Sequence, residues 1–163
     1  MVAPRVSVQG QDFDLGAEVA ALHAGNPAVG AVVAFVGTVR DRNDHNDGSG
    51  VQSMELEHYP GMTERAIEAM IDDALQRFGI EGARVVHRIG LLQPLDQIMM
   101  VAVTSAHRGS AFQACEFLMD YLKTQAPFWK KEQTPSGARW VDARVADDAA
   151  LRRWGIAASN AGP

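Results

Sequence analysis

Two apolar segments separated by a short turn place the strongest limit on how this chain can fold. Residues 83–90 (ARVVHRIG) and 97–105 (QIMMVAVTS) are rich in apolar and β-branched side chains, as strands are, and the turn between them contains Pro94. A doubly wound parallel sheet, which is the alternative, needs a helix between most of its strands. Paired strands between helices instead indicate an α+β domain with a mainly antiparallel sheet.

Two principal helices are predicted between the strands. In residues 63–79 (TERAIEAMIDDALQRFG), apolar side chains recur at helical spacing and Gly79 ends the helix. The second helix runs from about Gly109 to Gln125, because the residue before Pro127 avoids helical geometry. The remaining predicted elements are strands at 5–9, 29–40, 51–59 and 138–145, and short helices at 15–25 and 147–154.

Two of these strands carry further information. Residues 29–40 (VGAVVAFVGTVR) are nearly all apolar, which is typical of a central strand, and Gly37 within them indicates a bulge or a close backbone approach. Residues 51–59 alternate between apolar and polar side chains, with Glu55 and Glu57 on the polar side. This alternation predicts a strand with one face in water.

Length and composition limit the class of protein. A chain of 163 residues that is 47% hydrophobic fits one soluble domain, which we place at 1–155, followed by a frayed tail at 156–163. The net charge of −5 argues against a general nucleic-acid binder. The N-terminus has no hydrophobic segment like that of a signal peptide, and no apolar run reaches the roughly 20 residues that span a bilayer. We therefore expect the cytoplasm as the location.

All three lysines of the chain lie in MDYLKTQAPFWKKE (119–132), whereas twelve arginines carry the remaining positive charge. A proline ends the helix that carries Lys123, so we expect Lys130 in an irregular segment that folds back toward Lys123. Burial or neighbouring cations lower the pKa of a lysine from about 10.4 toward values that suit acid–base or nucleophilic chemistry. In the alternative, Lys123 pairs with Asp120 and the helix C-terminus, and Lys131 is a surface cation.

Other cations lie where strands end. In SAHRGSAF (105–112), His107 and Arg108 stand at the start of the second helix, where free backbone N–H groups favour an anion. Arg40 follows the 29–40 strand and can offer its fork of donors to a phosphate or carboxylate. Each could instead be a surface charge, or for the histidine a cap or packed ring. Together with the lysines, these residues predict a basic pocket for a small anion.

Other chemistry is not indicated. Cys115 lies among apolar residues and is interpreted as a small buried hydrophobe. The other histidines lack metal-ligand spacing, and the sequence contains no P-loop, G-x-G-x-x-G or G-x-S-x-G motif. We therefore expect neither a metal nor an organic cofactor.

Six segments of the chain resemble the catalytic (large) subunit of molybdopterin synthase. They are FVGTVR, LEHYPGMTE, HRIG, TSAHRGSAF, MDYLKTQAPFWKKE and RWVDAR, and they follow one another in unbroken order over about residues 30–145. The SAHR segment alone would be unspecific. The YLKTQAPFWKKE segment at this distance from it is specific.

The resemblance implies an α/β-hammerhead-type fold and a role in molybdenum cofactor biosynthesis. That family converts cyclic pyranopterin monophosphate into molybdopterin, with sulfur from the C-terminal thiocarboxylate of a small ubiquitin-like subunit. Its large subunits form a central homodimer within a heterotetramer, and one small subunit binds at each end. No nucleic acid, membrane or cofactor is implied.

The resemblance also implies roles for individual residues. Lys123 and Lys130 match the catalytic lysines of the family, and the substrate-binding positions fall on Thr38, Val39, Arg40, His107, Arg108, Lys130, Lys131 and Glu132. The arginines and His107 would hold the anionic substrate while the two lysines act as acid–base groups. A lysine often stands in the family where this chain has Thr38, which removes one cation from the rim of the site.

Two further expectations concern loops, and two other functions remain open at this point. The polar loop 41–50 is expected to become ordered when ligand binds, and Arg144 to reach a neighbouring subunit's site. A non-catalytic anion-binding module would use the same basic pocket without turnover. A lyase would form a Schiff base at Lys130, activated by Lys131.

Overall fold

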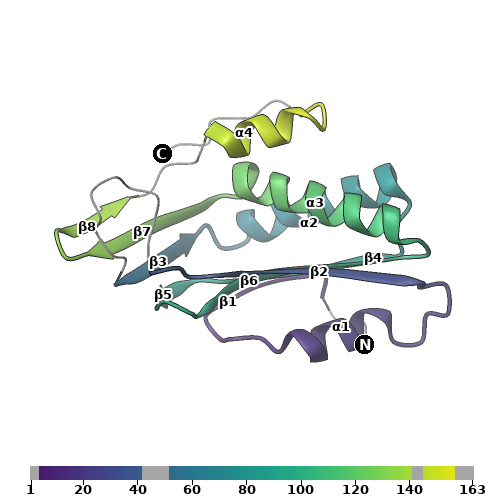
Figure 1. The fold of residues 1–163 in the computed structure, drawn as a ribbon, viewed down its shortest axis with the longest axis horizontal. Helices are drawn as coiled ribbons and strands as arrows, with labels where there is room; N and C mark the ends of the chain where they lie inside the picture. The colour runs from purple at the N-terminus through teal and green to yellow at the C-terminus, as the bar shows by residue number, and fades with distance from the viewer. Residues whose placement is uncertain (1–3, 42–51, 141–144, 157–163) are drawn as a thin grey trace.

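The computed structural model describes residues 4–41, 52–140 and 145–156. Figure 1 shows the elements within these ranges, which are coloured along the chain. They are β1 (Val6–Gln9), α1 (Leu15–His23), β2 (Ala31–Thr38), β3 (Ser53–His58), α2 (Met62–Phe78), β4 (Gly82–Arg88), β5 (Gly90–Leu92), β6 (Gln97–Ser105), α3 (Arg108–Gln125), β7 (Phe128–Thr134), β8 (Gly137–Trp140) and α4 (Val145–Arg152).

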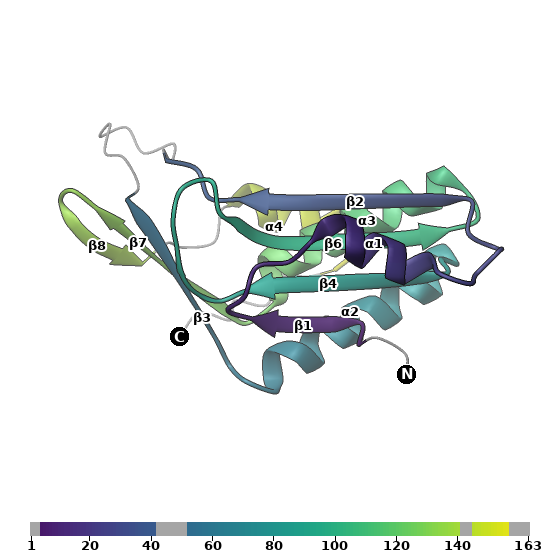
Figure 2. The ribbon, with the colours of Figure 1, turned by 90° about the horizontal axis from the view of Figure 1, so that it is seen from below.

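The first sheet has the strand order β1-β4-β6-β2. Only the β1–β4 pair is parallel, and β4–β6 and β6–β2 are antiparallel. Helices α2 and α3 cover one face of this sheet and α1 lies on the other, as Figures 1 and 2 show. The predicted α+β class, the mainly antiparallel sheet and the two principal helices are confirmed.

The main core lies between this sheet and α2 with α3. Alternation along β4 assigns each side chain to a face: Val85 packs toward α2 and α3, and Val86 packs toward α1. Both are fully buried. Two helix ends form as their sequences predict. The Asp14 carboxylate caps α1 by accepting a hydrogen bond from the Ala17 N–H, and Gly79 ends α2 with φ 60°.

The second sheet has the order β5-β3-β7-β8 and extends past the end of the first (Figure 1). Its inner face carries Met54 and Leu56 of β3, which pack with Leu92 and Val39 in a second core cluster. Glu55 and Glu57 are exposed on the opposite side, as the alternation predicted.

Two expectations about strands were wrong. The 29–40 segment is not a central strand, because β2 forms the edge of the first sheet; its side chains are apolar although one edge of its backbone is unpaired within the described residues. Residues 128–134 are not irregular, because β7 pairs with both β3 and β8. The bulge expected at Gly37 is confirmed as a register shift between Gly37 and Thr38.

The C-terminal part returns to the core. Trp154 and Ile156 pack against the main cluster, and Asp120 on α3 accepts hydrogen bonds from Arg153 and from the Trp154 indole N–H at 2.8 and 2.7 Å. Residues 141–144 of the predicted 138–145 strand, which include Arg144, and residues 42–50 of loop 41–50 lie outside the described residues. Within the predicted strand, residues 138–140 belong to β8 and Val145 begins α4. No helix within the described residues is both long and apolar enough to cross a membrane.

Candidate functional site

A pocket of about 460 Å³ opens where the C-terminal half of α3 meets the ends of β2 and β7. Lys123 of α3, Lys130 of β7, and Thr38 and Arg40 at the end of β2 all line it. The structure therefore brings together the two lysines and two of the predicted substrate-binding residues. Apolar side chains form most of the remaining wall: Phe35, Val36, Met54, Leu56, Ile98, Met99, Met119, Leu122, Ala126 and Phe128.

Local geometry explains why Lys123 and Lys130 meet. Helix α3 ends at Gln125, the C-cap Ala126 has an extended backbone, and the chain turns directly into β7. The Thr63 hydroxyl of α2 fixes this turn by donating to the Pro127 carbonyl at 3.0 Å. Because side chains alternate along a strand, Lys130 then leaves β7 on the same face as Phe128, toward the pocket.

A buried carboxylate holds Lys130. Glu132 is two residues further along the same face of β7 and is 0% exposed, and its Oε1 lies 3.3 Å from Lys130 Nζ. The side chain of Lys130 is 33% exposed, so its ammonium group lies at the boundary between this buried anion and the open pocket. Glu132 thus helps to hold the Lys130 ammonium group at the pocket.

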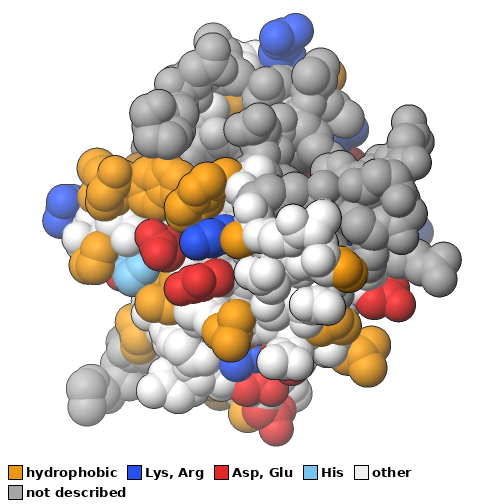
Figure 3. Space-filling view, turned by 90° about the vertical axis from the view of Figure 1, so that its left-hand side faces the viewer, with side chains coloured by type: hydrophobic (Ala, Val, Ile, Leu, Met, Phe, Trp, Pro, Cys, Tyr) orange, Lys and Arg blue, Asp and Glu red, His pale blue; other side chains and the backbone are white. Residues whose placement is uncertain are grey.

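Lys131 lies on the opposite face of β7. Its Nζ is 5.6 Å from the centre of the Trp140 ring, in cation–π geometry, and Lys131 is absent from the lining of the pocket. Figure 3 shows this end of the molecule, where charged side chains of both signs lie among hydrophobic ones. This placement matches the interpretation of Lys131 as a surface cation.

Val39 is also turned away from the pocket. Its side chain is 2% exposed and packs between the two sheets. Its backbone N–H donates to the Asp96 carbonyl and its carbonyl accepts from the Leu95 N–H, both at 2.9 Å. Val39 can therefore contribute to a site only by fixing the backbone between Thr38 and Arg40.

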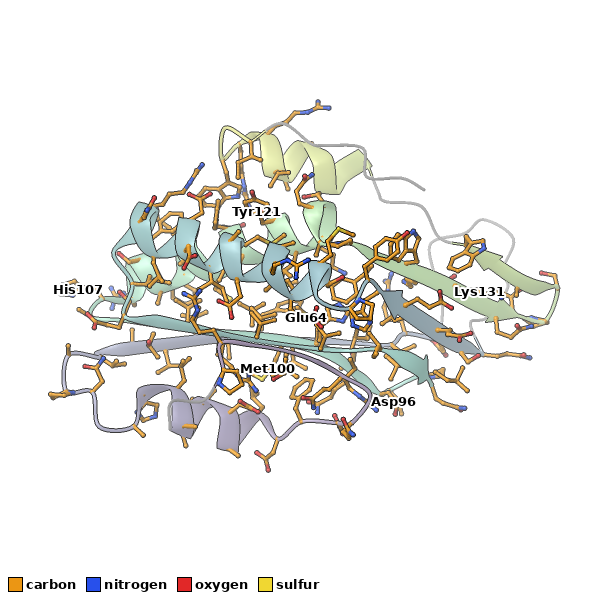
Figure 4. All side chains as sticks on the ribbon, turned by 180° about the vertical axis from the view of Figure 1, so that it is seen from behind. Glu64, Asp96, Met100, His107, Tyr121 and Lys131 are labelled. Atoms are coloured by element: carbon orange, nitrogen blue, oxygen red, sulfur yellow. The ribbon has the colours of Figure 1, made fainter. Side chains whose placement is uncertain are left out.

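His107 and Arg108 stand at the far end of α3. His107 is the N-cap and Arg108 the first residue of the helix, as predicted. With a rise of 1.5 Å per residue, the fifteen residues from Arg108 to Lys123 span about 22 Å. Figure 4 shows His107 and Lys131 at opposite ends of the molecule. The two N-terminal residues do not reach the lysine pocket of the same chain.

In the alternative interpretation Lys123 pairs with Asp120, but other side chains also donate to this carboxylate. Asp120 Oδ2 accepts hydrogen bonds from the Arg153 guanidinium and the Trp154 indole. Both donors come from the segment after α4, so Asp120 anchors that segment to α3. Lys123, by contrast, lines the pocket.

His87 also lines the pocket, and its spacing in the sequence indicated no role as a metal ligand. Its ring stacks on Phe128 with centroids 3.8 Å apart, and its Nδ1 lies 2.8 Å from the Arg88 carbonyl oxygen. Burial, with smaller contributions from the nearby charges of Lys123 and His58, lowers the pKa of His87 to about 4. The ring is therefore neutral near pH 7. The available signal was its position two residues after Val85, on the buried face of β4.

A second hollow lies beside the first, between β2 and α3. It has a volume of about 380 Å³ and a mostly apolar lining, formed by Val33, Ala34, Phe35, Phe112, Cys115, Glu116 and Met119. Phe112 of α3 is 61% exposed and Phe35 of β2 is 41% exposed, although both are large aromatic residues. Cys115 is buried as predicted, and burial raises the pKa of its thiol to about 11.

The first pocket is suited to an anion. Arg40, Lys123 and Lys130 supply three cations to one cavity with largely apolar walls, where electrostatic attraction is stronger than in bulk water. The described residues contain no group of three or more His, Cys, Asp or Glu side chains that could hold a metal ion. Lysine is also a residue type that can act as a general acid or base.

Comparisons with known proteins agree on one family. The profile of the MoaE protein family matches residues 8–125. The molybdopterin synthase catalytic subunit of Ralstonia nicotianae is 65% identical over 97% of this chain and 88% of its own length, and that of Pseudomonas aeruginosa is 54% identical over 91% and 97%. The solved molybdopterin biosynthesis MoaE protein from Burkholderia ambifaria is 58% identical, with a TM-score of 0.80 over 94% of this chain and 99% of that chain.

Proposed function

The chain belongs to the MoaE family, and we propose that it works as the catalytic subunit of a molybdopterin synthase. In this proposal it converts cyclic pyranopterin monophosphate into molybdopterin, as a sulfurtransferase in the cytoplasm. The sulfur comes from the C-terminal thiocarboxylate of a small ubiquitin-like subunit. The observation that carries the proposal is the convergence of Lys123, Lys130 and Arg40 in one pocket of a chain with such close relatives.

The pocket residues fit distinct steps of this reaction. The Arg40 guanidinium can bind the substrate phosphate through paired hydrogen bonds. When the sulfur of the small subunit attacks the substrate side chain and the cyclic phosphate opens, the departing oxygen needs a proton. Lys123 and Lys130 line the same cavity and can supply and recover that proton as general acid and base.

His107 and Arg108 enter this proposal through a second copy of the chain. They lie too far from Lys123 to serve the pocket of their own chain, yet a helix N-terminus with two basic side chains favours an anion. We therefore place them at the pocket of a partner subunit. Val39 and Lys131, which face away from the pocket, have supporting roles at most.

The edge strand β2 supplies a surface for that second copy. Its apolar edge and the neighbouring hollow beside Phe112 are unusual on a monomer, because exposed edge strands invite pairing. Two β2 strands that pair antiparallel about a two-fold axis near Ala34 place Ala31 of one chain beside Thr38 of the partner subunit. Ala31 pairs with Ser105 of β6, and His107 lies two residues after Ser105, so His107 then approaches the partner's pocket.

A sulfur-transfer assay tests the proposed function. The chain is mixed with a thiocarboxylated small subunit and cyclic pyranopterin monophosphate, and the oxidised fluorescent pterin product is quantified. Product that requires both proteins is the expected result. Binding of the small subunit without any product would instead support a non-catalytic anion-binding module.

A further inference from the structure

We propose that His87 is a positioning residue for Lys123, in which the imidazole Nε2 accepts a hydrogen bond from the lysine ammonium and holds it in the pocket. The effect on turnover rests on the function proposed above. The interaction between the two side chains does not depend on it, and it can be measured without any substrate.

The orientation of the ring is fixed from two sides. The Arg88 carbonyl can only accept a hydrogen bond, so His87 Nδ1, 2.8 Å away, carries the proton and donates it. Phe128 stacks on the ring face at 3.8 Å with an angle of 18° between the planes. With Nδ1 engaged by its own strand, Nε2 is the nitrogen that remains for the pocket that His87 lines.

The charges around His87 keep this nitrogen available as an acceptor. Lys123 approaches from α3 and His58 from β3, and both oppose a positive charge on the ring. Arg40 and Lys130 line the same pocket. Two acidic groups lie on this side, and each is close to another residue. Glu64 Oε1 of α2 is 3.4 Å from His58 Nε2, and Glu132 Oε1 of β7 is 3.3 Å from Lys130 Nζ.

A neutral acceptor suits an anion site better than a carboxylate does. A carboxylate beside Lys123 would cancel its charge and repel an anionic substrate, whereas a neutral imidazole orients the ammonium and leaves the net charge of the pocket unchanged. Hydrogen bonding to the charged form also favours that form. His87 should therefore raise the pKa of Lys123 relative to the same lysine without this acceptor.

Three substitutions separate positioning from packing. His87→Phe keeps a ring that can stack on Phe128 but has no nitrogen. His87→Gln loses the ring and places an amide near the position of Nε2. His87→Asn is its matched control, because its shorter amide can reach the Arg88 carbonyl but not the Nε2 position. A purely structural role predicts that the Phe variant is normal and that the two amides are equally impaired.

The readout uses the low lysine content of the chain. Incorporation of lysine labelled with ¹³C at Cε gives three NMR signals, from Lys123, Lys130 and Lys131, which Lys→Arg variants assign. We expect the titration midpoint of Lys123 to fall by roughly half a unit to one unit in His87→Phe and His87→Asn, and to stay close to the original in His87→Gln. The Lys131 signal, from the opposite face of β7, is the internal control.

Product formation in the sulfur-transfer assay is measured on the same variants across pH. The Phe and Asn variants should bind the small subunit normally yet form product up to about tenfold more slowly, and the Gln variant should recover most of the rate. An unchanged Lys123 midpoint in all three variants, or a normal Phe variant beside impaired Gln and Asn variants, would overturn the proposal. A shifted midpoint in a protein that forms no product would uphold it and reject the proposed function.

Discussion

Lys130 Nζ lies 3.3 Å from Glu132 Oε1, and the two side chains leave β7 on the same face. The carboxylate is completely buried and the lysine is one third exposed. A buried anion that is held in place behind a cation fixes the cation more firmly than a surface partner does, because both the screening by water and the freedom of the side chains are reduced.

Glu132→Gln should therefore lower both stability and activity. The substitution keeps the shape of the side chain but removes its charge, which leaves Lys130 without this buried counter-charge. We expect the free energy of unfolding to fall by about 1–3 kcal/mol in urea titrations, less than for a fully buried pair because Lys130 is partly exposed. A double-mutant cycle with Lys130→Gln measures the coupling between the two residues. Additive effects would show that the pair contributes nothing as a unit.

Lys123→Ala should abolish sulfur transfer without unfolding the protein. Lys123 is on the exposed side of α3 and alanine favours helices, so the thermal midpoint should remain close to the original. Loss of a general acid or base lowers the rate by about 10²–10⁴-fold. Lys131→Ala is the matched control, because it removes the same charge from the opposite face of β7. Near-normal product from Lys123→Ala would contradict the catalytic assignment.

Mixing two inactive variants should restore activity if the site is shared between subunits. Lys123→Ala retains His107 and Arg108, and Arg108→Ala retains Lys123. In a mixed dimer, one of the two sites then combines intact groups from both chains. Random reassociation at equal concentrations makes half of the dimers mixed, so about a quarter of the native activity is expected. If activity did not recover after verified subunit exchange, Lys123 and Arg108 of different subunits would not share one site.

The protein should lose stability as the pH falls from about 6.5 to about 4. An unfolded histidine has a pKa near 6.5, whereas the pKa of His87 in the folded protein is about 4. Between these values the unfolded chain binds more protons, so acid favours unfolding, and the contribution is fully present above pH 6.5. It amounts to about 3 kcal/mol at most.

His87→Phe should remove this part of the pH dependence. Urea titrations of both proteins between pH 4 and 7 give the comparison, in which carboxylates that titrate in the same range contribute equally to both. A difference in unfolding free energy between the two proteins that does not change with pH would show that His87 is protonated normally in the folded state.

The sequence predicted best where local signals and packing agree. The second long helix and the pairing of β4 with β6 followed from spacing and from a short turn. Strand β7 was missed because its inward face carries Lys130 and Glu132, the reverse of the usual alternation between a buried apolar and an exposed polar face. Charged side chains on the inward face of a strand obscure the apolar–polar alternation by which strands are recognised in a sequence.

Other parts of the site depend on three-dimensional information. The apolar residues of β2 predicted burial, but the sequence does not indicate whether another strand or another molecule covers the edge. Clustering of Lys123 and Lys130 followed from the lysine distribution. The distance of about 22 Å between Arg108 and Lys123 follows from the length of the predicted helix, but which pocket the N-terminus of α3 serves does not. His87 was not identified as a pocket residue, because its neighbours Phe128 and Lys123 are distant in sequence.

Helix α3 fixes the direction in which Lys123 points around the helix axis, as well as its distance from Arg108. Each added residue turns the rest of a helix by about 100°, so one insertion between Phe112 and Lys123 would swing the lysine away from β7 while leaving every side chain of the helix chemically the same. Arg108 would keep its place at the first turn. Substitutions at the exposed positions of α3 should therefore be tolerated, whereas an insertion or deletion between Phe112 and Lys123 should disrupt the site.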